Sequence, residues 1–185
     1  MNTFFRKTLQ HYNLPGHAHY LTFSCQKRMK LLTTDQTRQW FLQALQLACD
    51  KWDVACWAYV IMPEHAHVLA YPRQPVYEIE DFIQTLKQSV AQKAINQLKR
   101  IQSPLLKKLE VSPGHYQFWL QSAGYDKNVV EEQAIHNMIE YIHNNPIRRE
   151  LAATQLEWFW SSARAWLLGI DEPIAIDRDV PRLVT

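Results

Sequence analysis

The stretch that decides the fold runs from Val54 to Tyr71 and reads VACWAYVIMPEHAHVLAY. Its first half, to Met62, is almost continuously apolar, which is typical of a central strand that is buried on both faces. Pro63 and Glu64 interrupt this run, and the second half then alternates along the chain as a strand does. The short interruption predicts that the two strands form a hairpin in the middle of a sheet.

The sequence on either side of the hairpin predicts three helices and further strands. Thr34 or Asp35 can cap the first helix, Ser103-Pro104 stops the second, and Pro146 ends the third. The predicted helices are 34–49, 78–101 and 131–145, and the predicted strands are 20–25, 116–120 and 126–130, with a loop or short helical piece at 105–114 and a turn around Gly124.

This order of elements is strand, helix, strand, strand, helix, strand, helix. It is a βαββαβ-like, ferredoxin-like order, and it predicts an α+β fold with an antiparallel-rich sheet and helices packed on one face. We find no internal repeat and no low-complexity linker, so we expect a single domain over residues 1–185. Its core is expected at about 16–167, with a C-terminal tail at 170–185. From Trp158 onward the chain is aromatic first and polar later, so we expect it to be packed at first and then frayed.

Composition excludes several classes of protein. The 185 residues are 47% hydrophobic and 21% charged, which is too apolar for a disordered chain, and four glycines are few for a glycine-rich nucleotide fold. No run of about 18 apolar residues exists, so nothing is expected to span a membrane. Three cysteines without metal spacing, and the absence of a signal-like N-terminus, favour reduced thiols in a soluble, cytoplasmic protein.

Two His-Ala-His triplets, at 17–19 and 65–67, are candidate metal sites. Side chains two apart in a strand point to the same face, so either pair could bind one ion. We favour His65 and His67, because that pair lies on a central and therefore rigid strand. Structural zinc would need two more strong ligands, and none is spaced nearby. Two imidazoles leave room for water and a phosphate, which suits an ion that acts on a phosphodiester.

Tyr141 is the candidate nucleophile. It shares a helical face with Asn145, four residues on, whose carbonyl oxygen could complete the shell of a metal. A tyrosine phenol can attack phosphorus and conserve the bond energy in a phosphotyrosyl link. The alternative is that Tyr141 only packs in the core. No general base is evident, and His143 and His115 are candidates, as is a metal-bound water.

Basic residues are unevenly distributed although the net charge is only +2. Residues 82–109 contain no acidic side chain, and a second basic cluster lies at 27–30. These clusters could bind a nucleic-acid backbone, or they could be solvated surface. The candidate DNA-binding residues are Lys27, Arg28, Lys30, Lys87, Lys93, Lys99 and Arg100.

Four motifs in order resemble the REP-associated tyrosine transposases, relatives of the single-tyrosine insertion-sequence transposases in the HUH nuclease superfamily. The resemblance covers about 16–167. It rests on Tyr59–Leu69 with its histidine–hydrophobic–histidine strand, on Phe118-Trp119 followed by Gly124-Tyr125-Asp126, on Tyr141–Pro146, and on Trp160-Ser161-Ser162. Each motif alone is weak, whereas four in the same order are specific.

The resemblance implies an HUH endonuclease fold and a metal-dependent transposase that cleaves and rejoins single-stranded DNA at palindromic hairpins through a covalent 5′-phosphotyrosine. His65 and His67 would bind Mg²⁺ or Mn²⁺, Tyr141 would be the nucleophile, and Asn145 would stand at a polar ligand position. Two departures are Glu64, where the family often has Asn, and Asn145, which is shorter than the Gln of insertion-sequence relatives. Relatives are monomers or homodimers, and no feature here decides between them.

Three other functions stay open. A transposase-derived protein that binds single-stranded or structured nucleic acid without cutting would not need Tyr141 or a metal. A metal-dependent phosphodiesterase that uses water would leave no covalent adduct. A purely structural protein has nothing specific in its favour.

Overall fold

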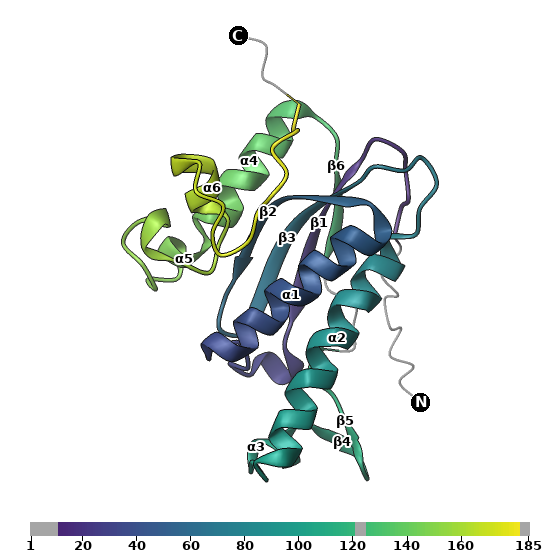
Figure 1. The fold of residues 1–185 in the computed structure, drawn as a ribbon, viewed down its shortest axis with the longest axis vertical. Helices are drawn as coiled ribbons and strands as arrows, with labels where there is room; N and C mark the ends of the chain where they lie inside the picture. Colours follow the sequence, from purple (N-terminus) through teal and green to yellow (C-terminus); the bar gives the residue numbers. More distant parts are fainter. Residues whose placement is uncertain (1–10, 121–124, 182–185) are drawn as a thin grey trace, which may run out of the picture.

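The computed structural model describes residues 11–120 and 125–181 and contains a four-stranded antiparallel sheet (Figure 1). Its strands lie in the spatial order β2-β3-β1-β6. Their bounds are Ala18–Ser24 for β1, Val54–Ile61 for β2, His65–Pro72 for β3 and Asp126–Val129 for β6. The β2–β3 pair is the predicted hairpin, and the order along the chain confirms the predicted α+β, ferredoxin-like arrangement.

Two long helices cover one face of the sheet. They are α1, Asp35–Trp52, and α2, Ile79–Arg100. The Thr34 hydroxyl caps α1 by accepting a hydrogen bond from the backbone N–H of Thr37 at 3.2 Å. Apolar side chains of the two helices pack on the sheet in one core cluster that includes Phe23, Phe41, Leu45, Phe82 and Leu86. Both helices begin and end within a few residues of the predicted bounds.

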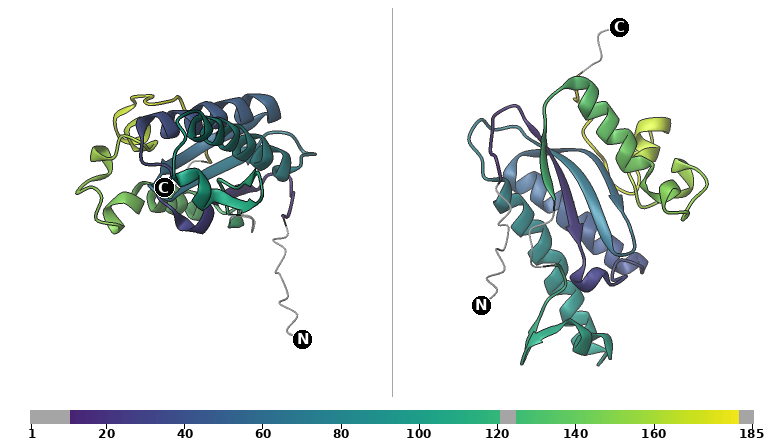
Figure 2. Two further views of the ribbon diagram at one scale, coloured as in Figure 1. Left: turned by 90° about the horizontal axis from the view of Figure 1, so that it is seen from below. Right: turned by 180° about the vertical axis from the view of Figure 1, so that it is seen from behind.

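A third helix, α4, Glu132–His143, covers the opposite face, so the prediction of helices on one face is wrong (Figure 2). Ile135, Ile139 and Ile142 pack against Val60 and Leu69 in a second core cluster. The physical reason is the continuous apolar run of β2, whose side chains are buried on both faces and need a covering layer on each. Two short helices follow, α5 at Asn145–Arg148 and α6 at Ala163–Leu168.

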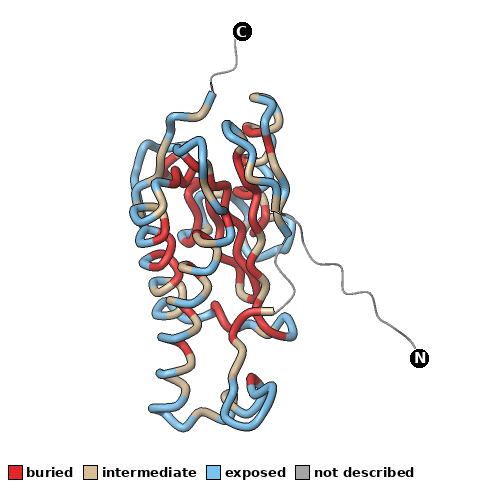
Figure 3. Tube along the Cα trace, turned by 90° about the vertical axis from the view of Figure 1, so that its right-hand side faces the viewer, coloured by how far each residue is buried: buried red, intermediate tan, exposed pale blue. Residues whose placement is uncertain are grey.

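The far end of α2 extends beyond the sheet (Figure 1). It leads into α3, Leu105–Leu109, and a small hairpin of β4, Glu110–Ser112, and β5, His115–Tyr116. Much of this extension is exposed at the bottom of Figure 3.

The prediction of one continuous strand at 116–120 is wrong. Only Tyr116 belongs to β5, whereas Trp119 forms an isolated bridge with Cys25 at the end of β1. The chain changes partner within this segment, because the Gln117 N–H bonds to Leu109 while Leu120 bonds to Ser24. The turn expected at Gly124 lies outside the described residues.

The C-terminal segment pairs with the outer edge of β2. The Ile61 N–H donates to the Trp160 carbonyl at 2.8 Å, and the Ser162 N–H donates to the Tyr59 carbonyl at 3.0 Å. Two 3-10 turns complete the described chain, η1 at Gln26–Arg28 and η2 at Gln155–Glu157. In the part of the chain that the structure describes, no helix combines the length and apolar character needed to cross a bilayer.

Candidate functional site

The two histidines of β3 converge on the face of the sheet that α4 covers. The Nε2 atoms of His65 and His67 lie 3.1 Å apart, and each residue is only 6% exposed. As predicted, Ala66, Val68 and Ala70 point to the opposite face, where they join the core cluster beneath α1 and α2. The pleat of a central strand thus brings the two imidazoles together and keeps them rigid.

The second nitrogen of each imidazole has its own partner. His65 Nδ1 lies 3.1 Å from the Oε1 atom of Glu64. His67 Nδ1 lies 2.8 Å from the Tyr20 hydroxyl and 3.0 Å from the Thr22 hydroxyl. A carboxylate only accepts hydrogen bonds, so Glu64 selects the His65 tautomer that carries its proton on Nδ1. The Nε2 lone pair of His65 therefore points toward His67.

Burial favours the neutral form of both rings. Burial and, to a smaller extent, the neighbouring His65 together lower the pKa of His67 to about 3. Burial also lowers the pKa of His65, although the carboxylate of Glu64 opposes that shift. Both imidazoles are therefore unprotonated at neutral pH, and this is the form that binds a metal ion.

The geometry of the pair fits a six-coordinate cation. Neighbouring ligands of an octahedral ion with bonds of about 2.1 Å are roughly 3.0 Å apart, and the two Nε2 atoms are 3.1 Å apart. Among the described residues, no group of three or more His, Cys, Asp and Glu side chains could hold a metal ion. A cation bound by His65 and His67 would therefore keep several positions for oxygen ligands.

Tyr141 lies beside the histidines at the surface of α4. The centre of its ring is 6.2 Å from that of His67 and 6.0 Å from that of Tyr20, and the residue is 38% exposed. The Arg148 guanidinium carbon lies 4.7 Å from the centre of the Tyr141 ring. An open cleft of about 400 Å³ is lined by Tyr20, Thr22, His67, Tyr125, Lys127, Met138 and Tyr141. The structure thus brings the predicted nucleophile and His67 to one cleft, with His65 directly behind His67.

Asn145 does not continue the helix of Tyr141. The helix α4 ends at His143, and the buried Asn145 begins α5, with Pro146 in the first turn of that helix. The predicted helix at 131–145 is therefore two residues too long, because the chain breaks the helix just before the proline. The role of Asn145 as a metal ligand stays a prediction.

The two histidines considered as general bases differ in position. His143 is buried, and its Nε2 lies 2.8 Å from the Ser162 hydroxyl in the C-terminal segment. Burial lowers the pKa of His143 to about 4. His115 is exposed in β5, on the extension beyond the sheet. Neither side chain lines the cleft of Tyr141 as the structure describes it.

The predicted DNA-binding residues fall into two groups. Arg28 is close enough to His65 to lower its pKa. In the same turn, the Lys27 ammonium donates to the Lys108 carbonyl at 3.3 Å, and Lys30 is exposed. The other group projects from α2, on the opposite side of the sheet from the histidines, and comprises Lys87, Lys93, Lys99 and Arg100.

The residues of α2 are engaged within the protein to different degrees. Lys93 donates to Gln43 at 2.9 Å, the Lys99 ammonium lies 4.8 Å from the centre of the Tyr116 ring, and Arg100 is exposed. Burial lowers the pKa of Lys87, which borders a groove together with Tyr116 and other residues of that segment. A role of either group in DNA binding stays a prediction.

Sequence reasoning missed several residues around the cleft. Tyr20 and Thr22 were assigned only to a strand, although Thr22 lies directly opposite His67 in the β1–β3 register. A correct pairing of the two strands would have identified Thr22 as a neighbour, because opposite residues share a face. Tyr125 and Lys127 carry no such signal, because their position depends on β6 joining the far side of β1.

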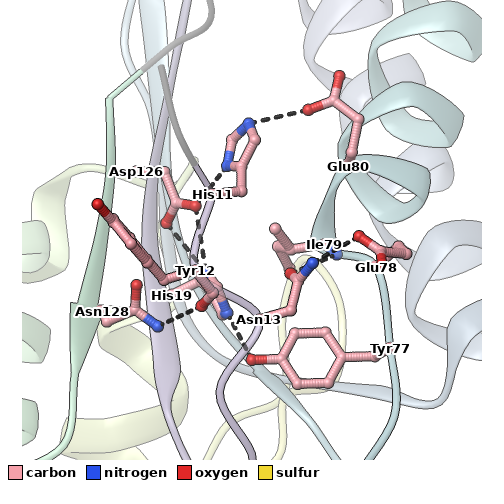
Figure 4. A network of polar contacts seen from close by, with 10 residues as sticks. All are labelled: His11, Tyr12, Asn13, His19, Tyr77, Glu78, Ile79, Glu80, Asp126 and Asn128. Atoms are coloured by element: carbon pink, nitrogen blue, oxygen red, sulfur yellow. Dashed lines mark hydrogen bonds and ion pairs between the residues drawn. The ribbon is translucent and has the colours of Figure 1, made fainter. Parts of the chain in front are cut away.

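The other His-Ala-His triplet has a different environment (Figure 4). His19 is fully buried on the α2 side of the sheet. Its Nδ1 lies 3.0 Å from Asp126 Oδ1, and its Nε2 lies 2.9 Å from the Tyr77 hydroxyl. His11 also contacts Asp126, at 2.5 Å, and Glu80, at 2.8 Å. Both ring nitrogens of His19 are thus occupied by side chains of the protein.

The charge of Asp126 is balanced by these contacts. Burial alone would raise the pKa of this carboxyl group, but hydrogen bonds from His19 and His11 outweigh burial and lower it. The network connects the segment before β1 to the start of β6 and to the beginning of α2 (Figure 4). His19 therefore has a structural environment rather than an open ligand position.

Comparisons with known proteins show the family and the fold of the chain. A family model described as Transposase IS200 like matches residues 15–145, which is most of the chain. A solved structure of a REP-associated tyrosine transposase bound to a REP hairpin aligns with a TM-score of 0.68 at 16% identity, and covers 96% of this chain and 98% of that one. This likeness confirms the predicted fold.

A putative transposase from Deinococcus radiodurans R1 aligns with a TM-score of 0.46 at 17% identity, over 74% of this chain and 96% of that one. No curated protein has a matching sequence. The match over residues 15–145 includes both the histidine pair and the helix of the tyrosine. The chain therefore belongs to the family of IS200-like transposases.

Proposed function

We propose that this protein is a metal-dependent endonuclease and strand transferase that cleaves and rejoins single-stranded DNA through a covalent 5′-phosphotyrosine at Tyr141. The observation that carries the proposal is the single cleft in which Tyr141 lies beside His67, whose Nε2 converges with that of His65. A phenol next to a pair of neutral, convergent imidazoles is suited to attack on a phosphodiester.

The residues of the cleft have separate tasks in this reaction. The Tyr141 oxygen forms a bond to phosphorus, and the bond from phosphorus to the 3′ oxygen of the preceding nucleotide breaks. The phenol proton passes to water in the open cleft, and the departing 3′ oxygen takes up a proton. Arg148, over the Tyr141 ring, and Lys127, in the cleft wall, supply positive charge where negative charge develops. Rejoining reverses these steps with another 3′ hydroxyl.

His65 and His67 would hold the cation, Mg²⁺ or Mn²⁺, with Asn145 as a candidate third ligand. A bound cation polarises the phosphate and neutralises its charge. The remaining task of the protein is to align the phosphate with Tyr141, which the rigid strand β3 and the helix α4 can do because both pack in the second core cluster.

The substrate would be single-stranded DNA with a palindromic hairpin. The structurally similar REP-associated transposase was solved with a REP hairpin, and the turn that carries Lys27, Arg28 and Lys30 lies next to the histidine pair. Basic side chains that contact phosphates release counterions, so binding should weaken steeply with salt. The lysines of α2 would contact DNA only if it passes around the end of the sheet.

The test is incubation of the protein with 5′- and 3′-labelled hairpin DNAs and Mn²⁺, followed by a denaturing gel. A panel of hairpins with single-stranded flanks covers the unknown sequence preference. We expect a metal-dependent protein–DNA adduct that is lost in both Tyr141→Phe and His67→Ala. Gel-shift assays on the same variants control for DNA binding, which Tyr141→Phe should retain.

Other outcomes distinguish the alternatives. Cleavage that persists in Tyr141→Phe without an adduct would indicate water as the nucleophile. Hairpin DNA that is shifted but never cut, equally by the parent and both variants, would indicate a transposase-derived binding protein.

A further inference from the structure

A chain of three side chains leads from the surface to the histidine pair. The Arg149 guanidinium donates to Glu64 Oε1 at 2.8 Å, and the same oxygen lies 3.1 Å from His65 Nδ1. The Glu64 and His65 side chains are nearly buried, whereas that of Arg149 is 51% exposed. The arginine compensates the charge of a carboxylate that would otherwise be buried beside a single neutral ring.

The backbone around Glu64 is held in place. The Glu64 carbonyl accepts a hydrogen bond from the Cys25 N–H at 2.9 Å, and the Met62 N–H donates to the His65 carbonyl at 2.8 Å. Arg149 is also held in place at the end of α5, because its backbone N–H donates to the carbonyl of Asn145, the first residue of that helix, at 3.2 Å. Both ends of the contact thus come from ordered backbone, which favours one geometry for the side chains.

Glu64 is placed to act on the cation through His65 rather than to bind it directly. Its Oε1 atom contacts Nδ1, on the side of the ring away from His67, whereas the convergent atoms are the two Nε2 atoms. In the described chain, Glu64 does not complete a group of three metal-binding side chains with His65 and His67. Carboxylates in this position orient the ring and make its other nitrogen a better ligand.

We propose that Glu64 and Arg149 are positioning residues that hold His65 in its Nδ1–H tautomer, with Nε2 free for a divalent cation. The inference rests on the proposed function for the identity of the site, but it concerns the His65 ring itself. It also assigns a role to the departure at Glu64. The arginine that supports this carboxylate directly follows α5, so the end of that helix and the start of the histidine strand β3 meet at this contact.

Removal of Arg149 distinguishes a positioning role from a simple effect of charge on cation affinity. The guanidinium is a positive charge near the histidine pair, since it lowers the pKa of His65. If charge alone mattered, its removal would tighten cation binding. If Arg149 positions Glu64, its removal releases the carboxylate and weakens cation binding. The two explanations therefore predict changes of opposite sign.

The first experiment measures Mn²⁺ affinity by electron paramagnetic resonance at pH 7.5, without DNA. We expect Glu64→Gln and Arg149→Ala to lower the affinity by about 10-fold, and Glu64→Ala by up to about 100-fold. Arg149→Lys should restore most of the loss. Arg178→Ala is the matched control, because this arginine also pairs with a carboxylate, that of Asp171 in the C-terminal segment, and it should leave Mn²⁺ affinity unchanged. Higher affinity in Arg149→Ala would overturn the inference.

The second experiment reads the tautomer directly, by ¹⁵N NMR of the histidine rings at pH 7.5 without metal. His65 should be in the Nδ1–H form in the parent and in a mixture of tautomers in Glu64→Ala, while the backbone spectrum stays that of a folded protein. An unchanged His65 tautomer in Glu64→Ala would overturn the inference. The tautomer measurement tests the role of Glu64 even if the parent binds no Mn²⁺. Failure of the parent to bind Mn²⁺ would contradict the proposed metal dependence and not the role of Glu64.

Discussion

The two His-Ala-His triplets lie on neighbouring strands, yet their histidines differ in every contact that determines function. His19 pairs across the sheet with Ala70, three positions from His67, but it points to the α1–α2 side. Both of its nitrogens are taken up by Asp126 and Tyr77. His65 and His67 point to the other side and direct one nitrogen each at a common point.

The difference teaches that the spacing of two histidines establishes only which face they share. What decides between a structural and a functional role is whether the surrounding side chains occupy one nitrogen of each ring or both. Glu64, Tyr20 and Thr22 contact Nδ1 only, which leaves the two Nε2 atoms, 3.1 Å apart, to share a proton or to bind a cation between them. The second triplet thus has an incomplete set of contacts, whereas His19 has a complete one.

The largest expected effect is on metal binding. His67→Ala should lower Mn²⁺ affinity by more than about 100-fold, since it removes a ligand, and positioning groups alone are worth about 10- to 100-fold. His19→Ala should change Mn²⁺ affinity by less than about 2-fold, because its nitrogens have no free lone pair. Titration calorimetry on the folded variants measures both. Equal losses in the two variants would show that the comparison is wrong.

Stability should respond in the opposite way. His19→Ala leaves the buried Asp126 with His11 as its remaining imidazole partner, and we expect a loss of about 3 kcal/mol in the free energy of unfolding. His67→Ala should cost only about 1 kcal/mol in metal-free buffer, because the partners of His67 are neutral groups and no buried charge loses its partner. Urea unfolding at pH 7.5 tests this, with His17→Ala as a control. A larger loss for His67→Ala than for His19→Ala would contradict it.

A smaller effect is expected when pH is lowered. A metal ion competes with protons for an imidazole, and the pKa of His67 is about 3 while that of His65 is also below its ordinary value. Mn²⁺ affinity should therefore fall by less than about 3-fold between pH 7 and pH 5.5. One imidazole with an ordinary pKa of about 6.5 would lose about tenfold over this range. A tenfold or steeper loss, measured by electron paramagnetic resonance, would show that burial does not protect the pair.

Two tyrosines, one at each triplet, allow a finer comparison of similarly small effects. Tyr20→Phe removes a hydroxyl from His67 Nδ1, but Thr22 remains there, so we expect a 2- to 5-fold loss of Mn²⁺ affinity, somewhat less than the about 10-fold typical of such outer contacts. Tyr77→Phe removes the hydroxyl between His19 and the Leu14 carbonyl and should cost about 1 kcal/mol of stability without affecting the metal. Titration calorimetry measures the Mn²⁺ affinity of both variants, and urea unfolding measures their stability. A larger loss of Mn²⁺ affinity in Tyr77→Phe than in Tyr20→Phe would contradict the comparison.

Local sequence was sufficient for much of the fold because most elements have a clear period and clear ends. The run at 54–62 predicted a central strand, and Ser103-Pro104 and Pro146 marked helix ends within a few residues. The alternation of His65 and His67 with Ala66 and Val68 predicted that the histidines point to the opposite face of the strand from these apolar residues. The prediction of one strand at 116–120 failed because the β-forming residues of this segment pair with two different partners. No local pattern in the sequence reveals such a change of partner.

Contacts between distant residues could not be predicted in this way. Glu64 and Arg149 are 85 positions apart and meet only because the sheet and α5 are both in place. The same holds for the cleft wall at Tyr125 and Lys127, which depends on β6. The burial of β2 on both faces was visible in its sequence, but the layer that covers the second face was not identified. Sequence thus named the proposed reacting groups, and the tertiary structure shows which residues surround them.

The pairing of the C-terminal segment with β2 has a consequence for biosynthesis. Val60 forms its bridge with Ser161, and the roughly 100 residues between them take on the order of 5–20 s to translate. During that time, the outer edge of the most apolar strand has no neighbour and is a template for pairing with other nascent chains. We therefore expect this chain to complete its fold only after Ser161 leaves the ribosome, and stalled or truncated products to depend on chaperones.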